Sequence, residues 1–111
     1  MNHGYYDRAH LGDFGKIGES QPELAEKFFA WYGAVMGDGA LSKREKSLIA
    51  LAVSHAVQCP YCIDAYTKNS LEAGADLAQM TEAVHVAAAI RGGASLVHGM
   101  QMRGHHDAVS M

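Results

Sequence analysis

Apolar residues recur along much of the chain at the three- and four-residue spacing of amphipathic helices. The first such run has four large members, which are Leu24, Phe28, Trp31 and Val35. Because the sequence GDG interrupts the pattern, we predict a helix over about residues 22–36. Ser20 and Glu23 have the S-x-x-E spacing of a capping box, and Pro22 suits a first turn.

A second capping box, formed by Ser42 and Glu45, precedes the segment KSLIALAVSHAV. This segment is apolar on every side, so we expect it to be buried whether it is a helix or a strand. The capping box and the length of the segment favour a helix.

The next predicted helix begins at Pro60, since proline is well tolerated in a first turn. Its apolar positions are Ile63, Ala65, Tyr66 and Leu71. Gly74 is a natural residue just past its C-terminus. The two cysteines of the chain, Cys59 and Cys62, therefore lie at a helix start.

A third capping box, Asp76 and Gln79, opens the segment MTEAVHVAAAIRG. The following segment, GASLVHGMQMRG, is predicted to continue as a shorter helix or as a kinked extension past Gly92 and Gly93. The whole pattern predicts an all-α protein of about five to six helices.

We predict one domain over residues 1–111, because a chain of 111 residues has room for a single core. Its core spans 20–103. An N-terminal extension, 1–19, carries a short helix around Asp7 to Asp13, and 104–111 is expected to be a frayed tail.

Charge and hydropathy narrow the classes of partner. The formal net charge is -3, from nine basic and twelve acidic residues, which favours neither a nucleic acid nor an anionic membrane. The N-terminus has no signal-peptide pattern, and no apolar run approaches the roughly 18 residues of a membrane span. We therefore expect a cytoplasmic protein, in which a C-x-x-C pair is more often redox-active or metal-binding than structural.

The positions of Cys59 and Cys62 suit redox chemistry. The thiolate is the reactive form of cysteine, and a helix N-terminus stabilises it. One turn of helix brings both sulfurs within reach of a disulfide. Two alternatives are buried thiols that serve as core residues and half of a zinc site. No H-x(3–5)-H pair follows the cysteines, which argues against zinc.

Residues 41–99, LSKREKSLIALAVSHAVQCPYCIDAYTKNSLEAGADLAQMTEAVHVAAAIRGGASLVHG, resemble the carboxymuconolactone decarboxylase superfamily, specifically its AhpD-like alkylhydroperoxidase branch. The resemblance rests on CPYCIDA, the apolar segment before it, LEAGA after it, and the ending AAAIRGGASLVHG. More narrowly, four segments resemble peroxidase-like proteins associated with arsenosugar biosynthesis: YYD, FGKIGE, PELAEKFFAWYGAV and QMTEAVHVAAAIRGGASLVHGMQMR.

The resemblance implies an AhpD-like helical bundle that forms trimers or hexamers, and a peroxidase reaction without a bound cofactor. It implies that Cys62 attacks the peroxide and becomes a sulfenic acid, and that Cys59 then condenses with it. A thiol reductant protein or a lipoyl-type donor would return the electrons. The helix dipole instead favours Cys59 as the more acidic thiol, so the two arguments differ on the order. Muconolactone decarboxylases lack the cysteine pair, which makes decarboxylation the weaker expectation.

The chain departs from the AhpD-like pattern at the proton relay. Ser47 and Tyr66 replace a glutamate and a histidine of that pattern. Tyr66 can relay a proton, although a phenol is a poor base at neutral pH. His55 is the first candidate for a replacement base, since imidazole both accepts and donates protons near neutrality. The alternative is a core histidine with a satisfied hydrogen bond.

Other polar residues near the cysteines have structural and functional interpretations. Glu45 is explained by its capping box, and Asp64 by the dipole of the cysteine helix. Tyr61 lines the entrance of the site or packs against another element. Two histidines complete the set of candidates, His98 as a second possible base and His85 as a core or interface residue.

These observations predict a dithiol peroxidase or disulfide reductase that acts on a peroxide or another small oxidised substrate. The alternative function is an arsenical-binding or redox-inactive partner protein that uses the vicinal thiols. We also expect a homo-oligomer, because residues 47–57 and 83–90 are apolar on more faces than one small core would bury.

Overall fold

The computed structural model describes residues 7–110, and every regular element in that range is helical. In chain order the elements are α1 (Arg8–Gly12), the 3-10 helix η1 (Phe14–Glu19), α2 (Pro22–Met36), α3 (Lys43–Ala56), α4 (Pro60–Glu72) and α5 (Leu77–Ser110). The predicted all-α fold of five to six helices is confirmed. The YYD motif begins in residues 1–6, which lie outside the described range, as does Met111 at the end of the predicted tail.

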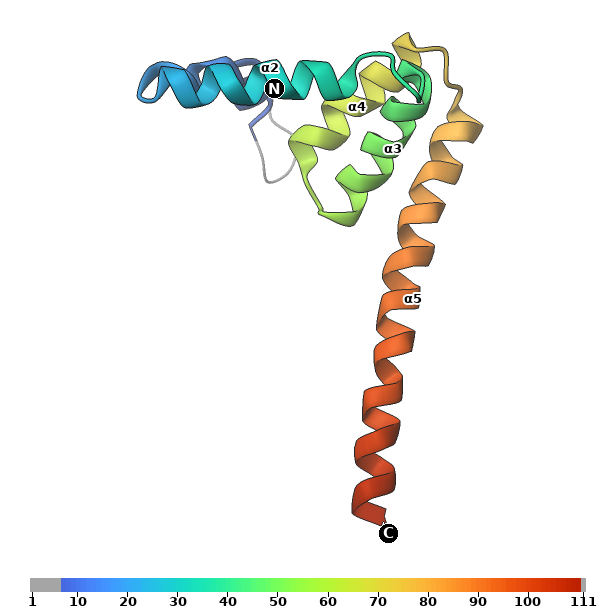
Figure 1. The fold of residues 1–111 in the computed structure, drawn as a ribbon. Coiled ribbons are helices and arrows are strands. Elements are labelled where there is room, and N and C mark those ends of the chain that lie inside the picture. The colour runs from blue at the N-terminus through green and yellow to red at the C-terminus, as the bar shows by residue number, and fades with distance from the viewer. Residues whose placement is uncertain (1–6, 111) are drawn as a thin grey trace.

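Helices α3 and α4 pack side by side as an antiparallel hairpin, and the first half of α5 packs along α3 (Figure 1). Helix α2 and the second half of α5 project from this hairpin in different directions, so the longest dimension is 60 Å. The core lies where α3, α4 and the start of α5 meet, and its buried apolar members are Leu51, Tyr66, Ala75 and Met80. Arg91 ties α5 to the hairpin through a hydrogen bond to the carbonyl of Ala56.

Two of the three predicted capping boxes form. The Ser42 hydroxyl accepts from Glu45 N at 3.1 Å while Ser42 N donates to Glu45 Oε1 at 2.9 Å. Asp76 and Gln79 make the same reciprocal pair at 2.8 and 3.0 Å. The predicted box of Ser20 and Glu23, at the start of α2, is wrong: the N-cap is Gln21, which makes no side-chain cap hydrogen bond.

The cause is Pro22, which takes the first helical position because proline has no N–H to satisfy. The N-cap is therefore Gln21, one residue after the Ser20 that the capping box requires.

Helix α3 is buried along one face rather than on every side. Its buried residues are Ser47, Leu51 and Ser54, which face α4 and α5. Ile49 and Val53 are 49% and 52% exposed. The expectation that α3 is buried on every side is therefore wrong for a single chain. Its three neighbours, α2, α4 and α5, are too few to surround it.

Helix α5 runs without interruption from Leu77 to Ser110, so neither a separate shorter helix nor a frayed tail at 104–110 is present. The glycines at 92, 93 and 104 each lower helix propensity by about 1 kcal/mol, but none of them removes a backbone hydrogen bond as proline would. The helix-propensity cost of these glycines is therefore not enough to end α5.

Candidate active site around the cysteine pair

The turn between α3 and α4 places both cysteines. Helix α3 ends at Ala56, and Gln58 then adopts a left-handed backbone with φ of 56°. Such a conformation is uncommon outside glycine and turns the chain sharply. Cys59 follows as the N-cap of α4, and Pro60 occupies the first helical position. The prediction that the cysteines lie at a helix start is confirmed.

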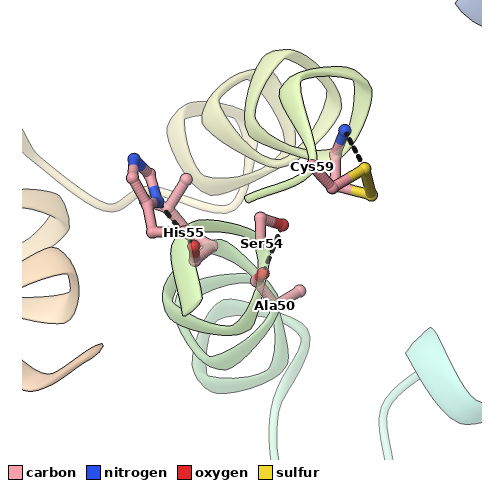
Figure 2. The surroundings of a disulfide bond; sticks show 6 residues. Ala50, Ser54, His55 and Cys59 are labelled. Carbon is pink, nitrogen blue, oxygen red and sulfur yellow. Dashed lines mark hydrogen bonds between the residues drawn. A yellow bond between two sulfur atoms is a disulfide. The ribbon is translucent and has the colours of Figure 1, made fainter. Parts of the chain in front are cut away.

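Cys59 and Cys62 are joined by a disulfide, with their Cα atoms 5.3 Å apart (Figure 2). The backbone N–H of Cys62 donates to Cys59 Sγ at 3.2 Å, so a sulfur takes the capping role that a serine or aspartate oxygen usually has. After reduction, the same N–H and the helix dipole would favour negative charge on Cys59. The predicted reach of the two sulfurs for each other is confirmed.

A cavity of about 430 Å³ opens beside the disulfide. Its α4 wall consists of Cys59, Tyr61, Cys62, Ala65 and Tyr66. The facing wall comes from earlier in the chain and consists of His10, Leu11, Phe14 and Tyr32. Partial burial in this wall raises the pKa of Tyr32 above its ordinary value of 10.0. A mostly apolar, aromatic pocket thus adjoins a reducible bond.

The two residues that replace the AhpD-like relay pair are separated by the fold. Tyr66 is buried, at 7% exposure, and lies in the wall of the disulfide cavity. Ser47 is buried on α3, but it lines a different cavity together with Lys43 and Asn69. The structure therefore brings Tyr66, and not Ser47, to the cavity of the cysteines.

The candidate base His55 is directed elsewhere. Its Nδ1 lies 2.8 Å from the carbonyl oxygen of Leu51, and its ring lies on the other side of Ser54 from the disulfide (Figure 2). His55 is not among the described residues that line the disulfide cavity. The four-residue spacing to Cys59 would place both on one face only in a continuous helix, and the left-handed Gln58 breaks that periodicity.

The remaining candidates have local partners. Hydrogen bonds from the backbone and then the side chain of Ser42 hold the pKa of Glu45 below its ordinary value of 4.5. Asp64 pairs with Lys68 at 3.7 Å, and His98 Nδ1 lies 2.8 Å from the Ala94 carbonyl oxygen within α5.

Tyr61 and His85 are the two remaining candidates from the sequence, and they lie in different surroundings. Tyr61 lines the disulfide cavity, as one of its two interpretations expected. His85 is exposed on α5, so it is not a core residue of this chain.

Residues 7–110 contain neither a metal-ligand cluster nor a membrane-spanning helix. No three His, Cys, Asp or Glu side chains in that range gather closely enough to hold a metal ion. No helix in the same range combines the length and hydropathy that crossing a membrane requires.

His10 is a cavity residue that was not among the candidates from the sequence. This residue lies on α1, 51 positions before Tyr61 in the chain, and its Nδ1 is 3.3 Å from the Tyr61 hydroxyl oxygen. The short helix around Asp7 to Asp13 was predicted and is confirmed as α1. Periodicity gives no signal of where such an isolated helix docks, so the contact could not be foreseen.

Comparison with known proteins identifies the family of this chain. The model of the carboxymuconolactone decarboxylase family matches residues 22–102. The chain belongs to this family. A protein of the cox locus of Paracoccus denitrificans is 43% identical over 90 residues, which are 81% of this chain and 78% of that protein. A protein of Cupriavidus necator is 27% identical over 97 residues, or 87% of this chain and 86% of that one.

Two solved structures share the fold of this carboxymuconolactone decarboxylase family member. One, from Methanobacterium thermoautotrophicum, superposes with a TM-score of 0.72 at 39% identity and covers 76% of this chain and 94% of its own. The other is an apo carboxymuconolactone decarboxylase family protein from Legionella pneumophila, with a TM-score of 0.68, 31% identity, and coverage of 82% and 86%. These matches do not support the narrower resemblance to proteins associated with arsenosugar biosynthesis.

Proposed function

We propose that the protein is a dithiol peroxidase that reduces a peroxide through Cys59 and Cys62. The observation that carries the proposal is the disulfide at the N-terminus of α4, beside an apolar cavity large enough for a small substrate. Membership of a family that includes AhpD-like peroxidases supports the proposal. So does the helix start, which stabilises the thiolate form that reacts with peroxides.

The proposed cycle begins with the reduced pair. The thiolate of Cys62 attacks one peroxide oxygen, the O–O bond breaks, and the other oxygen leaves as an alcohol after it gains a proton. Cys62 is then a sulfenic acid. Cys59 attacks that sulfur, the disulfide forms, and water leaves. The two thiols have lost two protons and two electrons, which a thiol protein or a lipoyl-type donor returns.

The order of attack follows the family resemblance, and the hydrogen bond at Cys59 Sγ suits it. A resolving cysteine must be a thiolate when it attacks the sulfenic sulfur, and it must leave as a thiolate when the reductant opens the disulfide at Cys62. The Cys62 N–H supports both steps. Tyr66, at the position of the family histidine, is proposed to relay a proton within the cavity.

The proposed setting is the cytoplasm, where cellular thiols would supply electrons, and the proposed assembly is a trimer or hexamer. The exposed apolar residues of α5, among them Ile90 and Val97, support self-association.

A coupled peroxidase assay with several thiol reductants tests the function. The wild-type protein should consume peroxide repeatedly, and mass spectrometry after mild peroxide should show the loss of two protons in the peptide that holds Cys59 and Cys62. Cys62→Ser and Cys59→Ser should each abolish turnover. Higher oxides on a single cysteine, with no disulfide, would contradict the cycle.

The close approach of the two sulfurs also suits chelation of trivalent arsenic, which is the competing function. An arsenite titration of the reduced protein separates the two functions. Tight one-to-one binding without peroxide turnover would favour a binding protein. Turnover that arsenite inhibits would favour the peroxidase.

A further inference from the structure

The N-terminal segment completes the wall of the disulfide cavity, although the family match begins only at residue 22. Helix α1 brings His10 against the first turn of α4, where His10 Nδ1 lies 3.3 Å from the Tyr61 hydroxyl oxygen. Their ring centroids are 6.4 Å apart. Tyr61 is the residue after Pro60, between the two cysteines, so this contact joins α1 to the C-x-x-C motif itself.

The other nitrogen of His10 faces a carboxylate. Asp7 Oδ2 lies 4.0 Å from His10 Nε2, and Asp7 Oδ1 accepts a hydrogen bond from Ala9 N at 2.9 Å as the N-cap of α1. The N-cap hydrogen bond therefore fixes the position of the carboxylate beside His10. A phenol, an imidazole and a carboxylate thus follow one another outward from the cysteines.

Resting on the proposed peroxidase function, we propose that His10 is a positioning residue that holds the Tyr61 hydroxyl in the cavity as the proton donor to the departing peroxide oxygen. His10 is the one histidine among the described residues that line this cavity. It supplies an ionisable partner in the cavity where Tyr66 replaces the relay histidine of AhpD-like proteins.

The proton balance of this step is simple. When the thiolate donates an electron pair to one peroxide oxygen, the O–O bond breaks and the second oxygen carries the negative charge. Tyr61 donates its proton to that oxygen and an alcohol leaves. The phenolate regains a proton from the Nδ1–H of His10 while Nε2 of the same ring takes one from solvent, to which the His10 side chain is 68% exposed.

Two reagents distinguish this role from a general effect on the thiols. Oxidation of the reduced protein by tert-butyl hydroperoxide requires a proton for the leaving oxygen, whereas alkylation by iodoacetamide releases iodide, which requires none. Tyr61→Phe should slow oxidation by about 10²-fold, the lower end of general acid catalysis. His10→Leu should slow it by about tenfold, the size of one hydrogen bond. Neither variant should change alkylation.

A double-mutant cycle tests whether the two residues act as one unit. His10→Leu combined with Tyr61→Phe should be no slower than Tyr61→Phe alone, while His10→Leu combined with Tyr66→Phe should multiply the two single effects. His10→Asn keeps a polar atom near the position of Nδ1 and should retain most of the wild-type rate. His98→Asn, on α5, is the matched control and should change nothing.

The outcomes separate this inference from the proposed function. A wild-type protein that forms no disulfide with peroxide would refute the proposed function. Wild-type oxidation that His10→Leu leaves unchanged, or equal losses of oxidation and alkylation, would overturn only the role of His10.

Discussion

The α3–α4 hairpin and the second half of α5 are both helical and both rich in apolar residues, yet they differ in what surrounds them. In the hairpin, Leu51 and Tyr66 are 2% and 7% exposed. In α5 beyond Arg91, Leu96 and Val97 are 80% and 64% exposed. Apolar spacing therefore predicts the helix in both regions, but burial depends on an opposing surface, which among residues 7–110 the hairpin has and the second half of α5 lacks.

The exposed part of α5 carries a regular apolar stripe. Its positions alternate at steps of four and three residues and are Val86, Ile90, Gly93, Val97, Met100 and Gly104. We call this set the α5 stripe. Such spacing is typical of a helix that packs along another helix. Since α3 contacts the face of α5 that carries the buried Met80 and Ala87, the stripe remains available for a second copy of the chain.

The largest expected difference between the two regions is in core stability. Leu51→Ala should lower the free energy of unfolding by about 2–5 kcal/mol, because it leaves a cavity among buried side chains. Leu96→Ala should change it by less than about 0.5 kcal/mol in the dissociated protein, because Leu96 is already in water. Urea denaturation followed by circular dichroism at low protein concentration measures both. Equal losses would mean that α5 packs within the monomer.

The α5 stripe should determine the oligomeric state. Ile90→Lys with Val97→Lys places two charges on the stripe, so this variant should be monomeric at micromolar concentration, whereas the wild-type protein should form the proposed trimer or hexamer. Light scattering gives the molar mass. Ser95→Lys, on the opposite face of α5, is the matched control and should remain associated. A wild-type protein that is monomeric in this experiment would contradict the proposed assembly.

A smaller effect should appear at the N-terminus of the hairpin. Because the folded-state pKa of Glu45 is lowered from 4.5, its ionised form stabilises the fold above that value, and the contribution is lost as pH falls through the folded pKa. Glu45→Gln should therefore be less stable than wild type at pH 7, with the difference shrinking at pH 3. Urea midpoints at the two pH values measure it. Glu26→Gln, on the exposed face of α2, should not reproduce this convergence.

The smallest expected effect is at His55. The His55 ring is hydrogen-bonded to the Leu51 carbonyl and points away from the sulfurs. The cysteines of the reduced His55→Gln variant should therefore react with iodoacetamide at the wild-type rate from pH 6 to 9. A slower or pH-shifted reaction would show that His55 reaches the cysteines after reduction.

Local chemistry made much of the fold predictable. Ser42 and Asp76 cap their helices with partners three residues away, and Pro60 and Gly74 mark the two ends of α4, where Gly74 has a φ of 93°. Each signal depends on neighbours in the sequence. The disulfide was predictable for the same reason, since Cys59 and Cys62 share one helical turn.

The rest depended on contacts that sequence spacing does not encode. One left-handed residue, Gln58, removes His55 from the site that helical periodicity assigned to it. His10 reaches Tyr61 only because α1 folds back across the cavity. The exposure of Ile49 on α3 follows from the number of helices around it, which no local pattern specifies.

The hydrogen bond from Arg91 to the Ala56 carbonyl divides α5 into two parts. Residues 77–91 are held against the hairpin, and residues 92–110 extend beyond it. Residues 92–110 extend for roughly 28 Å at 1.5 Å per residue. A rotation of about 10° about Arg91 would therefore move the C-terminal end by roughly 5 Å. Amide hydrogen exchange should become progressively faster from Arg91 toward Ser110 in the isolated chain. Packing of residues 92–110 against a neighbouring subunit should make the exchange rates along this segment more equal.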